Sequence, residues 1–317
     1  MNVNVFIEKK INKEDINLIL LAKDNEKKIS IFDVDIDSSL REFFYSALER
    51  TIDKSKILPI EKYDFDKNSD ESLLEFGSPD NDDLEFTNNV SKKLSMSHNK
   101  FIGFQQIEKM KLFAYCVKFF DREKNDSFYA ITKIQPSKIT TDEKKKGVIR
   151  ALFSTEDIKL TEYKETTISF NQKIDFFVYE NEYLIFNKPM FEQIVDISKL
   201  IEKKSNETVE KLKNNNAILG AENIEKFSKG NTILQKRLVK LHYIGIYNNL
   251  DSTQLKKIKS VGKAHKIDVK IENNKLVIHD NIEEVENICK LLCDYFKIGE
   301  ISGNKYGTYS GDILTAE

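Results

Sequence analysis

The stretch Lys173–Val195, KIDFFVYENEYLIFNKPMFEQIV, decides the fold of this chain because it contains a complete strand–turn–strand–helix pattern. Two runs rich in aromatic and β-branched residues, 174–178 and 183–186, are separated by the polar triplet Glu180-Asn181-Glu182. Such runs around a short polar turn are typical of a β-hairpin. We therefore expect an antiparallel pair of strands here.

A helix is expected directly after this hairpin. Asn187 offers a capping side chain and Pro189 a preset first-turn φ. Apolar residues at 191, 194, 195 and 201 then recur at helical spacing, which predicts that this helix continues past Leu200 and packs against the hairpin. The expected core of the unit consists of Phe176, Val178, Tyr183, Ile185 and Phe191.

Length and composition indicate a folded protein of the cytoplasm. The chain has 317 residues, 40% hydrophobic and 32% charged. It has no run of about 18 uncharged apolar residues, and its first ten residues already carry charge, so neither direct membrane insertion nor secretion is expected. The cysteines at 116, 289 and 293 are odd in number and form no CxxC pair, which favours a reducing compartment.

The order of the expected elements predicts an α+β fold. β-rich runs at 112–120 and 127–134 precede the hairpin and favour an antiparallel sheet covered by helices. The acidic stretch 63–89 is expected to be a surface loop or a poorly ordered one. We expect two domains: a mixed α+β domain at 1–217 with the antiparallel sheet, and a smaller α+β subdomain at 218–317 with a helix–helix–hairpin–helix order and basic helices.

Charge is distributed unevenly along the chain, although the formal net charge is only −2. The segment 61–86 has ten acidic residues and two lysines, whereas 229–270 has ten basic residues and two aspartates. Such asymmetry indicates either a polyanionic partner or contact between the two segments. Both interpretations remain open from sequence.

Basic side chains on two expected helices form the main candidate for binding nucleic acid. They recur at helical spacing, and a tyrosine among them offers a stacking surface. Lysines contact phosphates rather than base edges, so binding would depend weakly on sequence and steeply on salt. The candidate residues are Lys236, Arg237, Lys240, Tyr243, Lys256, Lys257, Lys259, Lys263 and Lys266, with a secondary basic loop at Lys144, Lys145 and Lys146.

Recognisable catalytic chemistry is missing from the sequence. The four histidines are scattered, and no HExxH, CxxC, GxGxxG or GxxxxGK[ST] pattern occurs, so no metal site, cofactor or catalytic residue is expected. One alternative is a metal-dependent nuclease built on Asp175, Glu180 and Glu182. Their spacing counts against it, because the glutamates fall in the hairpin turn, at the far end of the hairpin from Asp175.

Several segments together resemble a known family. SFYAITKI at 127–134, GVIRALFS at 147–154 and the hairpin–helix stretch are similar to the characteristic domain of the KwaB family of the Kiwa anti-phage defence system. The resemblance implies a DNA-binding protein that self-associates as a homodimer or higher homo-oligomer. It also implies a small transmembrane partner of the KwaA type, which would recruit the protein to the inner face of the cell membrane.

Two further readings differ from this DNA-binding defence protein. One is the nuclease of an unrecognised family described above. The other is a protein-docking module whose basic face meets an acidic partner or the chain's own 61–86 segment. The trigger of defence and the preferred DNA structure do not follow from the sequence.

Overall fold

The computed structural model describes residues 11–65, 72–77, 90–96, 98–103, 106, 110–134, 139–140, 151–154, 159–162, 167–180, 182–245, 247, 250–298 and 305–307. The chain divides into two compact units. The N-terminal unit comprises Met1–Lys62 and Glu71–Asp196, and the C-terminal unit comprises Tyr63–Asp70 and Ile197–Glu317. This division lies about 20 residues before the domain boundary expected at 217, and it assigns a short piece of the acidic segment to the C-terminal unit.

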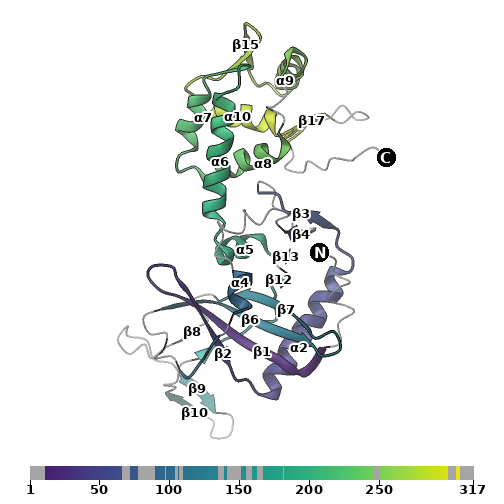
Figure 1. The fold of residues 1–317 in the computed structure, drawn as a ribbon, viewed down its shortest axis with the longest axis vertical. Helices are drawn as coiled ribbons and strands as arrows, with labels where there is room; N and C mark the ends of the chain where they lie inside the picture. Colours follow the sequence, from purple (N-terminus) through teal and green to yellow (C-terminus); the bar gives the residue numbers. More distant parts are fainter. Residues whose placement is uncertain are drawn as a thin grey trace. The chain divides into compact units, whose positions relative to one another are not determined.

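A mostly antiparallel sheet forms the N-terminal unit (Figure 1). Its order is β3-β4-β13-β12-β7-β6-β1-β2-β5, and only the edge pairs β3–β4 and β2–β5 are parallel. The strands are β1 (Ile11–Lys23), β2 (Ile29–Val34), β3 (Ile60–Lys62), β4 (Leu73–Phe76), β5 (Asn99–Lys100), β6 (Lys111–Asp121), β7 (Asp126–Lys133), β12 (Phe176–Tyr179) and β13 (Glu182–Ile185). Two short pairs lie outside it: β8 (Ile139–Thr140) with β11 (Thr167–Ile168), and β9 (Ala151–Ser154) with β10 (Lys159–Glu162). The α+β prediction is confirmed.

Helices cover both faces of this sheet. Neighbouring residues of a strand point to opposite faces. Phe177 belongs to the core formed with Phe44 of α2 (Ser38–Ser55), whereas Phe176 contacts Phe191 of α5 (Lys188–Val195) with ring centroids 5.2 Å apart. The short helix α4 (Val90–Leu94) accepts a hydrogen bond at the Leu94 carbonyl from the Tyr129 hydroxyl. The five residues predicted to form the hairpin core are each at most 2% exposed.

The hairpin itself forms as predicted, but the helix after it differs in two ways. Asn187 occupies the N-cap position, but its side-chain oxygen accepts no capping hydrogen bond, and its amide nitrogen donates to the Asp175 carboxylate. The helix ends early because Asp196 adopts a left-handed conformation (φ 52°), and a second helix, α6 (Ser198–Lys213), follows. Ile201 therefore lies on α6, in the C-terminal unit.

Part of the acidic stretch 63–89 is a buried strand rather than a surface loop. Leu73 and Leu74 of β4 are at most 2% exposed, and β4 pairs with β13, about 110 residues further along the chain. A four-residue strand offers almost no periodicity, and its pairing partner is remote in sequence. The sequence around β4 therefore shows only its acidic composition, which predicted a loop.

The C-terminal unit is mainly helical. Its elements after α6 are β14 (Ile218–Leu219), α7 (Ala221–Ser228), α8 (Thr232–Ile244), α9 (Ser252–Ala264), β15 (Lys270–Glu272), β16 (Lys275–Val277), α10 (Ile282–Leu292), β17 (Phe296–Ile298) and β18 (Lys305–Gly307). β14, β16 and β15 form a small sheet, and β17 pairs with β18. Val209 and Leu212 of α6 belong to the same core as Leu234 and Leu238 of α8, which is why α6 joins this unit.

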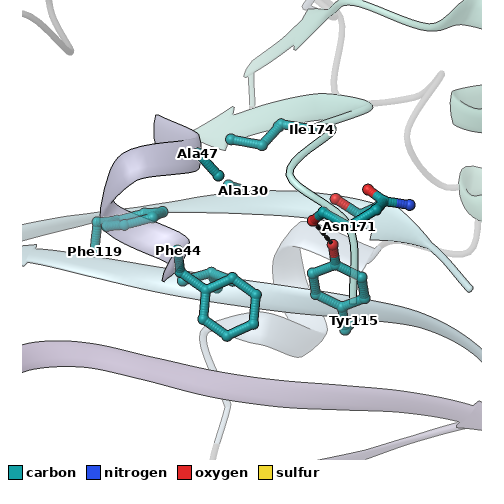
Figure 2. Close-up of a pocket in the computed structure, with 9 residues that line it drawn as sticks. Phe44, Ala47, Tyr115, Phe119, Ala130, Asn171 and Ile174 are labelled. Atoms are coloured by element: carbon teal, nitrogen blue, oxygen red, sulfur yellow. Dashed lines mark hydrogen bonds between the residues drawn. The ribbon is translucent and has the colours of Figure 1, made fainter. Parts of the chain in front are cut away.

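A small cavity lies under α2 in the N-terminal unit (Figure 2). Phe44 and Ala47 from α2 face Phe119 and Tyr115 of β6. The Tyr115 hydroxyl donates a hydrogen bond to the Asn171 carbonyl at 2.9 Å. The cavity measures about 10 Å³, close to what one water molecule requires and far below the roughly 300 Å³ of a small ligand pocket. It is a packing gap rather than a ligand site.

The described residues include no helix that is both long enough and apolar enough to span a membrane. All three cysteines are buried and unbridged. Burial raises the pKa of Cys289 to about 12 and that of Cys116 well above its usual value, so neither thiol has the acidity of a reactive cysteine.

Candidate nucleic-acid interface

Helix α9 exposes a row of lysines. Asp251 fixes its start, because the Asp251 carboxylate accepts hydrogen bonds from the backbone N–H groups of Thr253 and Gln254, both at 2.8 Å. Leu255 and Ile258 are buried in the core of the unit, which sets the rotation of the helix. The candidate lysines at 256, 257, 259 and 263 are consequently exposed. Lys266 is exposed as well, but α9 ends at Ala264 and Lys266 adopts a left-handed conformation (φ 60°), so it is not part of the predicted helical row.

Three of these lysines share one side of the helix. At about 100° per residue, Lys256, Lys259 and Lys263 fall within an arc of about 60°, and Lys257 lies on another side. None of the ammonium groups of the four candidate lysines on α9, nor that of Lys266, forms an ion pair or hydrogen bond with a residue that the structure describes. We call Lys256, Lys259 and Lys263 the α9 lysine face.

The basic residues of α8 are in a different environment. Lys236 is half-buried, and the Lys240 side chain is 10% exposed with its Nζ 2.8 Å from Oδ2 of Asp64. Tyr243 is exposed, and its ring stacks on that of Phe65 with centroids 6.0 Å apart and an interplanar angle of 9°. The structure thus places a short segment, Tyr63–Phe65, on the α8 part of the predicted site.

Arg237 does not lie on the surface, although the sequence placed it among the candidate residues for binding nucleic acid. It is 2% exposed, between α8 and α10, where the Cys293 thiol contacts the Arg237 carbonyl and the arginine charge opposes the burial effect on the pKa of Cys289. The Arg237 side chain is therefore buried inside the C-terminal unit and is not presented to a ligand. Apolar spacing predicts the centre of the buried side of α8, but it does not show how far burial extends to a flanking position such as Arg237.

Sequence reasoning did not identify Tyr63–Phe65 as part of the site. Phe65 is 4% exposed and also contacts the Tyr63 ring edge-on at 5.0 Å. The available signal was the opposite charge of segments 61–86 and 229–270, which left contact between them as one of two interpretations. The secondary basic loop, Lys144 to Lys146, lies outside the described residues.

The carboxylates of the nuclease alternative do not meet. Asp175 immediately precedes β12 and Glu180 immediately follows it, so about five residues of extended chain, roughly 16 Å, separate them. Asp175 is 3% exposed, and its carboxylate accepts hydrogen bonds from the Lys133 N–H and the Asn187 side chain, each at 2.8 Å. Asp175 therefore joins β7 to the start of α5 and is a structural residue. Among the described residues, no group of three or more His, Cys, Asp or Glu side chains is placed to hold a metal ion.

Asp175 makes a testable contribution to pH-dependent stability. Burial raises its pKa above the ordinary value, and the two hydrogen bonds oppose this only in part. The folded state then holds the proton more tightly than the unfolded state, so this contribution to stability is full below the unfolded pKa of about 4 and is lost as pH rises through the folded pKa. In urea titrations at several pH values, the unfolding free energy of the wild type minus that of Asp175→Asn should decrease as pH rises from about 4. Subtraction cancels the other titrating groups, and a difference that grows with pH would contradict this assignment.

The fold and the site together define a mixed α+β protein whose C-terminal unit exposes a lysine-rich helix. A family model described as Kiwa protein KwaB-like matches residues 109–302, which is more than half of the chain. The chain therefore belongs to the KwaB-like family, as the resemblance predicted. Membership makes it a component of Kiwa anti-phage defence and implies partner proteins within that system. No curated protein and no solved structure matches the chain.

Proposed function

We propose that this Kiwa protein binds DNA through the α9 lysine face and so blocks phage replication or transcription. The observation that supports this proposal is that three exposed lysines share one side of a helix without an acidic partner among the described residues. Unpaired ammonium groups at this spacing are suited to successive phosphates of a nucleic-acid backbone. Carboxylates that would repel a polyanion are sparse on α9 itself, where Asp251 is engaged in capping.

The proposal includes partners as well as DNA. Family membership supports a small transmembrane partner of the KwaA type and a homodimer or higher homo-oligomer of this chain. In this arrangement the protein stays in the cytoplasm until its partner recruits it to the inner face of the cell membrane. DNA bound by α9 would then be held close to the membrane.

Fluorescence anisotropy with two labelled duplexes of unrelated sequence tests the DNA-binding part. Lysine–phosphate contacts carry no base information, so the two dissociation constants should agree within about threefold. Three phosphate contacts predict that affinity falls about 40-fold between about 50 and 200 mM salt. No binding at about 100 µM protein in the lower salt would overturn the proposal, and so would a strong preference for one duplex.

A further inference from the structure

The contact of Tyr63–Phe65 with α8 has the chemistry of a bound nucleotide. Asp64 presents a carboxylate to Lys240 at 2.8 Å, in the position that a phosphate would take on a lysine. Phe65 lays its ring parallel to that of Tyr243, as an unpaired base stacks on an aromatic side chain. Lys240 and Tyr243 are three residues apart and so lie on one side of α8. An anion and a flat ring thus occupy neighbouring places on the helix.

The ion pair and the Phe65 ring are substantially removed from water, whereas Tyr243 remains exposed. The side chains of Lys240 and Asp64 are 10% and 23% exposed, and Phe65 is 4% exposed. A charge pair shielded in this way attracts more strongly than a pair on the open surface. Lys240 therefore differs from the exposed lysines of α9, because a ligand must first displace Asp64 to reach it.

We propose that Asp64 and Phe65 are an intramolecular competitor that occupies a second nucleic-acid site on α8, whose ligand is a single strand. We infer a single-stranded ligand because only an unpaired base can take the place of the Phe65 ring on Tyr243. This inference rests on the proposed function: α9 supplies binding at all times, and α8 adds to it when the Asp64–Phe65 contact opens. The arrangement makes single-stranded DNA a stronger ligand than duplex once that contact is released.

A first measurement tests the contact without any DNA. Brief treatment with an amine-acetylating reagent, followed by mass spectrometry, reports how accessible each lysine is. Lys240 should react much more slowly than Lys256 in the wild type, and Asp64→Asn should raise the Lys240 rate severalfold while leaving the Lys256 rate unchanged. An unchanged Lys240 rate in Asp64→Asn would overturn the inference.

A second measurement uses a labelled thymidine oligonucleotide and a duplex of the same length. Asp64→Asn should bind the single strand about fivefold more tightly at about 150 mM salt. The slope of log affinity against log salt concentration should become steeper by about 0.9, the effect of one added phosphate contact. The gain on duplex should be smaller. The matched control is Glu222→Gln, which removes the same charge from an exposed position in the first turn of α7 and should change affinity less than about twofold.

A double variant identifies the lysine that is released. Lys240→Gln should change affinity little in the wild type, where Asp64 already occupies Lys240, and should remove the gain in an Asp64→Asn background. Equal gains from Asp64→Asn and Glu222→Gln would show a general charge effect and overturn the inference. If neither the wild type nor any variant binds either DNA, both the proposed function and this inference are wrong. If the protein binds DNA but Asp64→Asn does not increase its affinity, only this inference is wrong.

Discussion

Replacing Gly220 with alanine is expected to destabilise the C-terminal unit by about 4 kcal/mol or more, the largest effect expected of a single substitution on stability in this protein. Gly220 has φ +82° and precedes α7, and an added Cβ would lie 2.0 Å from the Ile278 carbonyl oxygen. No rotamer change relieves a clash with backbone. The chain would have to separate β14 from the end of β16, where the Ile278 N–H donates to the Leu219 carbonyl at 2.9 Å.

Gly230 provides a matched control for this substitution. It also has positive φ, +77°, but an added Cβ would meet nothing within 4 Å. Gly230→Ala therefore isolates the cost of a left-handed backbone, about 1–2 kcal/mol. Urea denaturation, with hydrogen exchange of the C-terminal unit as a local readout, should show a difference of at least about 2 kcal/mol between the two variants. Equal effects would mean that the chain relaxes around the Gly220 contact.

The hairpin at 173–186 could be predicted from sequence because its determinants are local. Alternating side chains and a polar turn specify both strands, and their register follows from the turn. The α9 lysine face was predictable for the same reason, since Asp251 begins the helix and the apolar spacing fixes which side is buried. A structural feature whose determinants lie within a short stretch of sequence can be predicted without knowledge of the rest of the fold.

Other features depend on neighbours that are remote in sequence. β4 is a strand because β13 pairs with it, and Arg237 is buried because α10 lies against α8. The contact of Asp64 with Lys240 joins residues about 176 positions apart. Charge asymmetry gave contact between the two segments as one of two interpretations, but it did not show which residues meet. These features are determined by packing between remote segments, and no local sequence pattern predicts that packing.

Neutralising the α9 lysine face should have the largest effect on DNA binding. Changing Lys256, Lys259 and Lys263 together to glutamine removes three phosphate contacts, each of which contributes about 0.9 to the slope of log affinity against log salt. The slope for duplex should fall by about 2.7, and affinity at about 150 mM salt should fall on the order of 100-fold. The helix should remain folded, because these side chains are exposed and the buried side of α9 is unchanged.

The control for this variant carries the same change in charge elsewhere. Lys28, Lys54 and Lys111 are exposed lysines of the N-terminal unit, and changing all three to glutamine lowers the net charge equally. If DNA responds to overall charge, both triple variants lose affinity alike, and the α9 proposal is wrong. If DNA lies against α9, the control keeps its salt slope within about 0.5 of the wild type.

Lys257→Gln gives a finer test, because its side chain leaves the helix about 100° from Lys256 and should contribute less than a full phosphate contact. A loss as large as that of Lys259→Gln would instead show that DNA wraps around the helix rather than lying along one side.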